Sequence, residues 1–340
     1  MAKEAVTPTL ITIIFIFFTG LYGFVKFSYE KTRVDAAHTK TIPIATEIYP
    51  PGLPTPTPTN HGNISLNEPT RLLFTYVYTE SPTARVNLVF FLDNGLHGDA
   101  DFIFILNGPT DVADLIPSRD NIQVIPQSSV CSDLIAHGGV LRKDDLWKNY
   151  DQFIMLSSAV RGPFMPFWSR GCWSGVFLNR ITENVKLVGM KANCLPKFRI
   201  ESMVWATDTV GMGLLLGPPK SSSVPDMPDQ NHNQVVATGD HVRQMKQLIH
   251  HEVEVTRAIK SSGYKVDTLT SSPEIEDLQE ICATDSIEGA AYGNHDGVHP
   301  YETIFVKTSQ DTDSITVARL TELHQSRYMN GSWDVCHGVF

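Results

Sequence analysis

The sequence lacks the short motifs of several common enzyme classes. It contains no Gly-x-Ser-x-Gly elbow, no Gly-rich loop that ends in Gly-Lys-Ser or Gly-Lys-Thr, no His-Glu-x-x-His and no Cys-x-x-Cys. These motifs carry an activated serine, a phosphate cradle and the ligands of a zinc ion. Their absence weighs against an α/β-hydrolase, a P-loop nucleotide hydrolase, a zinc peptidase and a thiolate zinc domain.

Basic residues are scarce. Lys and Arg number 27 against 37 Asp and Glu, which gives a formal net charge of -10. A protein whose main partner is nucleic acid needs a basic face to neutralise phosphates, so the composition argues against that class. This composition still permits a single local basic pocket. The 340 residues suffice for one large domain or two small ones.

One stretch has no charge at all. Residues 5–25 are rich in Ile, Leu and Phe, and as a helix they would span roughly 30 Å, enough to cross a bilayer. Residues 1–28 are therefore predicted to be a cytosolic tail and a transmembrane anchor. A cleaved signal peptide is the alternative, and the small residues near its cleavage point are Thr19, Gly20 and Gly23. The basic residues that follow the stretch favour the orientation opposite to the one we predict.

The next segment predicts an extended, disordered stem. Residues 29–69 hold seven prolines among Thr and Asn from position 43 onward, a composition that gives a solvated spacer without a core. Asn63 and Asn330 begin glycosylation sequons. An anchor, a stem, a domain at 70–328 and a tail at 329–340 together resemble the layout of Golgi-resident transferases. We expect a single-pass protein of the Golgi or endoplasmic reticulum membrane with a lumenal domain.

The chain has five cysteines, an odd number. In an oxidising lumen, two disulfides and one free thiol would result. The sequence does not fix the connectivity. Cys172 with Cys194 is the pair that we would test first.

Apolar runs alternate with helical patterns along residues 71–156. Strands are expected at 71–78, 102–106, 122–125 and 153–156. The first is followed by a helix with Ser81 as its N-cap, Pro82 at its first position and Gly95 as its stop. This alternation predicts an α/β fold with a mostly parallel sheet and helices on both faces.

We expect the chain to be organised around residues 150–208, where the strand at 153–156 opens into Ser157-Ser158-Ala159-Val160-Arg161-Gly162. Ligands bind at the carboxyl ends of strands in open α/β sheets. Gly162 lets a backbone approach a ligand closely, and Arg161 suits phosphate. The alternative is an ordinary turn with a surface ion pair.

Several motifs then indicate a family. They are 156–164, Trp168, Cys172-Trp173, 185–189, Asn193-Cys194, 202–208 and 299–305. Together they resemble a little-studied eukaryotic group of glycosyltransferase-like proteins, which is distantly similar to bacterial rhamnan-synthesis glycosyltransferases and to glycosyltransferase family two. The resemblance covers roughly residues 70–325.

This resemblance implies a Rossmann-like GT-A fold that binds a nucleotide-sugar at its strand ends. The matching donor-binding positions are Thr79, Glu80, Asn107, Ser157, Ser158, Arg161 and Gly162. Glu80 and Asn107 would bond ribose hydroxyls or a base edge; alternatively, both cap turns. The tryptophans at 168, 173 and 205 would stack on sugar rings or belong to the core.

Sugar transfer needs a group that takes the proton of the acceptor and positive charge on the leaving diphosphate. The candidates for the first role are Glu302, Asp208 and His299, although Asp208 is also a natural helix N-cap. Arg161 is the candidate for the second role, with or without a divalent ion.

Many GT-A enzymes hold Mn²⁺ or Mg²⁺ through an Asp-x-Asp pair, but here that place reads Ser157-Ser158-Ala159. Asp99-Ala100-Asp101 precedes its strand and so lies at the wrong end of the sheet. No metal ligand is therefore assigned, and metal dependence stays open.

The sequence thus predicts a membrane-anchored glycosyltransferase that moves a sugar from a nucleotide-sugar to a hydroxyl of a glycan or glycoconjugate. The alternative is a catalytically inactive carbohydrate-binding or scaffold protein with the same fold. The missing Asp-x-Asp pair favours this alternative.

Overall fold

The computed structural model describes residues 70–166, 168–169, 171–216, 241–270, 282, 302–308, 313–326 and 332–336. The predicted anchor and stem, the sequon residues Asn63 and Asn330, and His299 lie outside these residues. Within the described ranges, no helix is long and apolar enough to cross a membrane. Residues 65–340 form one compact unit.

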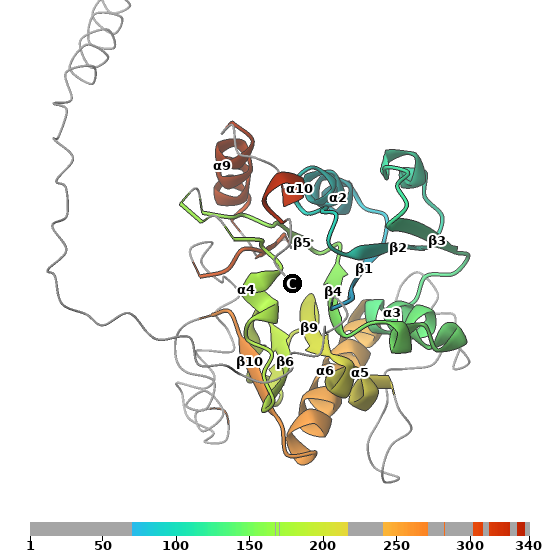
Figure 1. Cartoon of the computed structure of the whole chain (residues 1–340), viewed down its shortest axis with the longest axis vertical. Coiled ribbons are helices and arrows are strands. Elements are labelled where there is room, and N and C mark those ends of the chain that lie inside the picture. The colour runs from blue at the N-terminus through green and yellow to red at the C-terminus, as the bar shows by residue number, and fades with distance from the viewer. Residues whose placement is uncertain are drawn as a thin grey trace, which may run out of the picture. The chain divides into compact units, whose positions relative to one another are not determined.

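Seven strands form the central sheet, in the order β10-β6-β9-β4-β1-β2-β3 (Figure 1). Their bounds are Leu72–Tyr78 (β1), Asp101–Asn107 (β2), Ile122–Gln127 (β3), Gln152–Ser157 (β4), Val185–Gly189 (β6), Val204–Asp208 (β9) and Lys265–Thr268 (β10). β9 runs antiparallel to both of its neighbours, and the other adjacent pairs are parallel. The prediction of an α/β fold with a mostly parallel sheet is confirmed.

The order of the strands reverses at β1. The chain steps outward from β1 through β2 to β3, then crosses back to place β4 on the other side of β1. Val77 pairs with Ser157, and Tyr78 pairs with Leu106. The carboxyl ends of β1, β2 and β4 therefore meet at one edge of the sheet, which we call the carboxyl edge.

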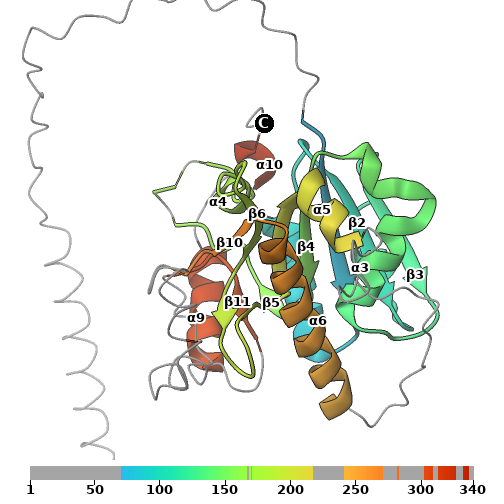
Figure 2. The ribbon, with the colours of Figure 1, turned by 90° about the horizontal axis from the view of Figure 1, so that it is seen from below.

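Both faces of β1 are buried: its residues are apolar or aromatic except Thr75, which is itself buried and hydrogen-bonded to His137. Phe74, Tyr76 and Tyr78 belong to a core shared with α2 (Pro82–Asn94), α4 (Gly175–Leu178) and α10 (Ser332–Val335). Leu73 and Val77 belong to a second core shared with α3 (Asp133–Arg142), α5 (Thr209–Leu216) and α6 (His241–Ser261). Figure 1 shows the sheet between these two groups, and Figure 2 shows α3, α5 and α6 over one face. Helices on both faces are thus confirmed.

The first helix begins and ends where its sequence predicts. The Ser81 hydroxyl accepts a hydrogen bond from the Ala84 amide at 3.1 Å, and Pro82 occupies the first turn. At the other end the Gly95 amide donates to the Phe91 carbonyl. A Cβ on Gly95 would lie 2.4 Å from the Phe91 ring, so this position requires glycine.

Smaller elements complete the domain. They are η1 (Val112–Leu115), η2 (Lys143–Asn149), α9 (Ser314–Gln325), the pair β5 (Val160–Arg161) with β11 (Val306–Lys307), and the pair β7 (Ala192–Asn193) with β8 (Arg199–Ile200). The predicted tail at 329–340 contains α10, whose Trp333 packs against the first core.

The disulfides differ from the predicted pair. Cys172 is bonded to Cys336, and Cys194 is bonded to Cys282, so the pairing of Cys172 with Cys194 is wrong. The reason is that Cys172 belongs to the core on one face of the sheet and Cys194 to the core on the other. Cys131 is free, so the expected count of two disulfides and one thiol is confirmed.

Candidate functional site at the carboxyl edge of the sheet

Five polar residues meet where the strand order reverses. Thr79 follows β1, and Asn107 ends β2. Ser157 ends β4, Ser158 follows it, and Asp133 begins α3. We call these residues the carboxyl-edge cluster. Four of them, Thr79, Asn107, Ser157 and Ser158, were predicted as donor-binding positions at strand ends, and Asp133 was not predicted.

Two hydrogen bonds join β1 to β4 within this cluster. The Thr79 amide donates to the Ser158 hydroxyl at 3.3 Å, and the Ser158 amide donates to the Val77 carbonyl at 3.0 Å. Asn87 of α2 adds a third contact by donating to the Ser158 carbonyl at 2.9 Å. The turn after β4 is therefore held firmly against the end of β1.

Asn107 fixes the next strand end. Its amide nitrogen donates to the Thr79 hydroxyl at 2.9 Å and to the Cys131 carbonyl at 2.7 Å, and its amide oxygen accepts from the Cys131 amide at 3.0 Å. The side chain is only 2% exposed. Asn107 thus positions the strand ends, in agreement with the turn-forming alternative, and its bonds hold the loop before α3 beside β1.

Asp133 supplies a carboxylate to a place where the β4 sequence has none. The Ser157 hydroxyl donates to it at 2.5 Å. Burial raises the pKa of the Asp133 carboxyl, and the bond from Ser157 opposes this rise. The available sequence signal was the Ser132-Asp133 pair, which stands where a helix begins after the third strand.

Asp133 and Ser157 both present oxygen atoms, the donors that Mg²⁺ and Mn²⁺ take. No group of three His, Cys, Asp or Glu side chains gathers at this edge in the described part of the chain. The residues therefore fit a divalent ion held by one carboxylate together with substrate phosphates, a common arrangement for Mg²⁺. They do not form a cage that binds an ion by itself.

Glu80 lies at the exposed rim of the edge. The Thr110 hydroxyl donates to it at 2.5 Å and Arg85 donates at 3.0 Å. The bond from Thr110, together with Arg85, lowers the pKa of the Glu80 carboxyl. Arg85 also pairs with Asp111, so two carboxylates of the protein itself neutralise its charge.

Arg161 is placed by β5, three residues beyond Ser158. Its Nε donates to the Asn87 side-chain oxygen at 2.9 Å, and its Nη1 donates to the Thr321 hydroxyl at 3.0 Å. Both acceptors are neutral, and no described carboxylate forms an ion pair with it. Burial lowers the pKa of Arg161. The residue is therefore a half-buried cation without a counter-charge among the described residues.

Gly162 is required by a close approach within the chain itself. A Cβ at this position would lie 2.5 Å from the Ile304 carbonyl and 2.5 Å from the Phe305 ring. The glycine thus allows the segment before β11 to pack on β5. This contact accounts for Gly162 without a ligand.

Two further candidates lie away from the cluster. Asp208 pairs with Gln152 at the amino end of β4, where it contacts Lys186 Nζ at 2.5 Å and accepts from the Gly211 amide at 2.9 Å. It therefore caps α5 at the opposite edge of the sheet. Glu302 lines a separate cavity beside β11.

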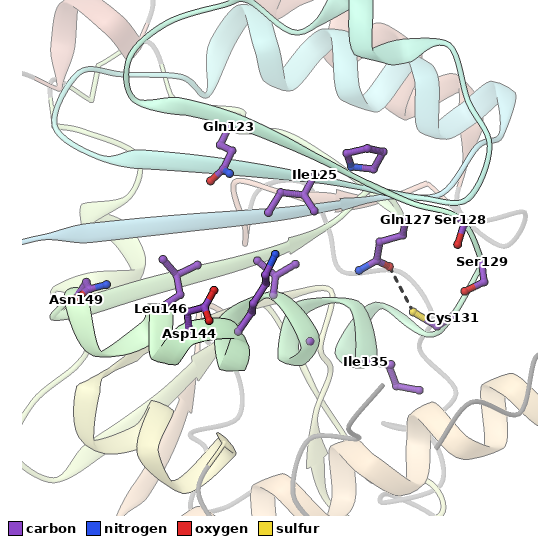
Figure 3. A pocket seen from close by; sticks show the side chains of 14 residues that line it. Gln123, Ile125, Gln127, Ser128, Ser129, Cys131, Ile135, Asp144, Leu146 and Asn149 are labelled. Carbon is purple, nitrogen blue, oxygen red and sulfur yellow. Dashed lines mark hydrogen bonds between the residues drawn. The ribbon is translucent and has the colours of Figure 1, made fainter. Parts of the chain in front are cut away.

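A cavity of about 600 Å³ adjoins the cluster between β3 and α3 (Figure 3). Gln123, Ile125 and Gln127 project from β3 toward α3 and η2, which contribute Ile135 and Leu146. The remaining lining residues include Ser128, Ser129, Cys131, Lys143, Asp144 and Asn149. We call this the β3–α3 cavity. Its walls combine aliphatic side chains with amides and hydroxyls, as small-molecule sites do.

Cys131 joins the cavity to the cluster. Its backbone is bonded to Asn107, and its thiol donates to the Gln127 side-chain oxygen at 3.7 Å. Burial raises the pKa of the Cys131 thiol to about 11. A thiol with this pKa is protonated at neutral pH and is a poor nucleophile, so the cavity is suited to binding and not to thiol chemistry.

No family model and no curated protein matches the chain. Its resemblance to a eukaryotic group and to bacterial rhamnan-synthesis enzymes stays a prediction. Solved structures with a similar arrangement include a synthase and two glycosyltransferases.

The first is a 4-diphosphocytidyl-2C-methyl-D-erythritol synthase, at 11% identity and a TM-score of 0.35 over 74% of this chain and 99% of that one. The second is a mannosyltransferase from Pyrobaculum calidifontis in complex with GDP-Man and Mn²⁺, at 11% identity and a TM-score of 0.33 over 66% and 79%. The third is a glycosyltransferase involved in glycosylation of the major capsid of PBCV-1, at 11% identity and a TM-score of 0.31 over 75% and 99%. Identities and TM-scores this low transfer no ligand or activity to this chain.

Proposed function

We propose that this protein is a glycosyltransferase that uses a nucleotide-sugar donor and a hydroxyl acceptor. The observation that carries the proposal is the bonded junction of Thr79 and Ser158, which lies where the strand order reverses. Ligands of open α/β sheets bind at such a point, outside the carboxyl ends of the strands. Beside this junction lies the β3–α3 cavity, whose volume of about 600 Å³ exceeds that of a nucleoside.

We assign the donor to this edge from the chemistry of the residues. Amides donate and accept hydrogen bonds as base edges do, so Gln123 and Gln127 suit the nucleoside inside the β3–α3 cavity. The diphosphate then lies over Ser157 and Ser158, close to the amino end of α3. Amide groups at the start of a helix favour an anion.

Neutralisation of the diphosphate falls to two groups. Asp133 and Ser157 would hold a divalent ion, which would supply positive charge to the leaving diphosphate when bound. Arg161 carries a charge that no described carboxylate compensates, and a guanidinium suits phosphate oxygens.

Transfer requires one bond to form and one to break. The acceptor oxygen bonds to the anomeric carbon, while the bond from that carbon to the diphosphate breaks and its electron pair leaves with the nucleoside diphosphate. The proton of the acceptor goes to Glu302, an exposed carboxylate that has no bond to another described residue. His299 remains a candidate for this role, and the position of Asp208 at the opposite edge removes it from our assignment.

A catalytically inactive carbohydrate-binding protein is the second candidate. It is favoured by the single carboxylate of the carboxyl-edge cluster, because enzymes that hold a metal through Asp-x-Asp present two.

We also propose that residues 1–28 anchor the domain in the Golgi or endoplasmic reticulum membrane, with the domain in the lumen. Two disulfides support an oxidising compartment, because such bonds are rare in the cytosol.

Thermal unfolding of the compact unit, residues 65–340, tests the proposal against UDP, GDP and ADP with and without Mn²⁺. A nucleotide at one hundred times its Kd adds about 2.7 kcal/mol of stability. Gln127→Ala should reduce the shift, whereas the matched control Gln325→Ala, exposed on α9, should retain it. If no nucleotide stabilises the protein and glycans do, the carbohydrate-binding candidate replaces the transferase.

A further inference from the structure

A second cavity, of about 570 Å³, lies beside the β5–β11 pair. Its walls come from segments far apart in the sequence: the loop after β5, α4, the end of β10, the segment before β11, and α9. We call it the α4–α9 cavity. Neither the carboxyl-edge cluster nor the β3–α3 cavity shares a residue with it.

The walls of this cavity are mainly apolar. Met165, Val176 and Leu320 line it, together with Trp168 and Leu323. Trp168 is 71% exposed and Leu323 is 49% exposed. Large apolar side chains left in water around one concave surface mark a binding site more often than single scattered ones do.

The polar groups of the cavity are mostly engaged. Arg180 Nη1 donates to the Asp267 carboxylate and to the Thr268 carbonyl, both at 2.9 Å. The Thr303 hydroxyl accepts from the Phe305 amide at 3.3 Å. Glu302, by contrast, forms no hydrogen bond or ion pair with another described residue. Glu302 is therefore, among the described residues, the carboxylate of a mainly apolar lining that also contains Arg180, Thr303 and His324.

One wall of the cavity lies at the same edge of the sheet as the cluster. The Leu269 amide, just past the end of β10, donates to the Gly189 carbonyl at the end of β6. β6 and β4 run in the same direction, because both are antiparallel to β9. The end of β6 therefore lies at the edge where Ser157 ends β4.

Backbone bonds also tie the two sites together. The Phe164 amide donates to the Ile304 carbonyl at 2.7 Å, and the Thr308 amide donates to the Ala159 carbonyl at 2.9 Å. The chain that leaves Ser158 thus forms a wall of the cavity within a few residues.

We propose that the α4–α9 cavity binds an acceptor that carries an alkyl or aryl group, with Glu302 accepting a hydrogen bond from its hydroxyl. This inference rests on the proposed function, because only a transferase has an acceptor, and it names the chemical class of that acceptor. A purely polar glycan could stack on Trp168, but it would leave Leu320 and Leu323 in contact with water. An apolar group removes this surface from water, which is the main source of affinity in such a site.

Binding of simple glucosides tests the proposal without a nucleotide. Methyl, hexyl and phenyl β-glucoside are titrated calorimetrically into the full chain in lipid nanodiscs, and empty nanodiscs correct for partition into lipid. The hexyl or the phenyl compound should bind about tenfold more tightly than the methyl compound, or better, because of its buried carbon atoms. Comparison of hexyl with phenyl distinguishes an aliphatic group from an aromatic one.

Variants on one helix provide the matched control. Leu323→Ser should remove most of the advantage of the apolar glucosides, whereas Ile315→Ser, 62% exposed on α9 but outside the cavity, should leave it intact. Equal affinity for all three glucosides, or no binding of either apolar one, overturns the inference. So does an equal loss in the two variants. Because nucleotide is absent, failure of the transferase proposal would show separately, as a lack of stabilisation by nucleotides.

Discussion

Asn107 offers the sharpest test of how the carboxyl edge is built. Replacing it by Ala removes three hydrogen bonds between nitrogen and oxygen, of 2.7, 2.9 and 3.0 Å, to Cys131 and Thr79. It also removes a weak bond that the Cys131 thiol donates at 3.5 Å. The Cys131 carbonyl and amide would then lose their partner. The loop before α3 would also lose its link to the end of β1.

The magnitude follows from these bonds. Each contributes about 1 kcal/mol net, and partners left unsatisfied in a buried place add to the loss. We expect Asn107→Ala to lower the free energy of unfolding by about 3 kcal/mol. For a domain of this size, Tm should fall by about 6 °C.

Asn121→Ala is the matched control. Asn121 also holds a loop, by donating to the His97 and Ala100 carbonyls at 3.0 and 2.8 Å, but it lies before β3, at the opposite edge of the sheet. It should lower the free energy of unfolding by about 2 kcal/mol and leave nucleotide affinity unchanged. Asn107→Ala should lower both the free energy of unfolding, measured by urea unfolding, and the nucleotide affinity, measured by nucleotide titration. If both variants weaken nucleotide binding equally, the carboxyl edge is not the donor site.

Three further predictions concern charge and covalent structure. Asp133→Asn should stabilise the protein at pH 7, because the raised pKa of Asp133 in the fold makes its ionisation costly. The stability that this carboxyl contributes is present below its ordinary pKa of 3.8 and is lost as the pH rises through its pKa in the folded protein. The gain should therefore vanish near pH 3 in urea titrations, and a gain that is equal at both pH values would contradict this cause. Cys336→Ser removes the disulfide to Cys172, which spans 164 residues, and should lower the free energy of unfolding in urea by about 3–5 kcal/mol. Cys131→Ser, at the free thiol, should lower it by less than about 1 kcal/mol. Equal losses in the two variants would be inconsistent with the pairing. Glu302→Gln should lower the rate of sugar transfer and leave nucleotide affinity unchanged in single-turnover assays, and an unchanged rate would exclude Glu302 as the base.

Local features of the sequence predicted much of the fold. Ser81, Pro82 and Gly95 mark the ends of α2 because capping depends on neighbouring residues. The buried strands were also evident, since their apolar runs are bounded by polar turns. The order of the strands in the sheet was not evident, because no short sequence pattern records that β4 returns to the other side of β1.

The candidate site was predictable only in part, for the same reason. Thr79, Asn107 and Ser157 were found because each directly follows or ends a predicted strand. Asp133 was missed because it lies on a helix, 24 residues away along the chain from Ser157, which its carboxylate contacts. The pairing of Cys172 with Cys336 depends on which face of the sheet each residue occupies, and this is settled only by the tertiary fold.

The charge distribution at the carboxyl edge leads to a last test. Arg85 is paired with Glu80 and Asp111, so its charge is neutralised within the protein. Arg161 has only the neutral partners Asn87 and Thr321, so its charge remains for a ligand. If Arg161 and an ion at Asp133 share one diphosphate, their contributions to affinity must be coupled. Removing either makes the other matter more.

A double-mutant cycle measures this coupling. Nucleotide affinity is compared for the wild type, Arg161→Gln, Asp133→Asn and the double variant, with and without Mn²⁺. Residues that act on one ligand group show interaction energies of about 0.5–3 kcal/mol, whereas independent sites are additive within about 0.5 kcal/mol. Additive losses would mean that Arg161 only joins β5 to α2 and α9. Coupling that disappears when Mn²⁺ is withheld would place the ion at Asp133, because the carboxylate can assist an anion only through a cation.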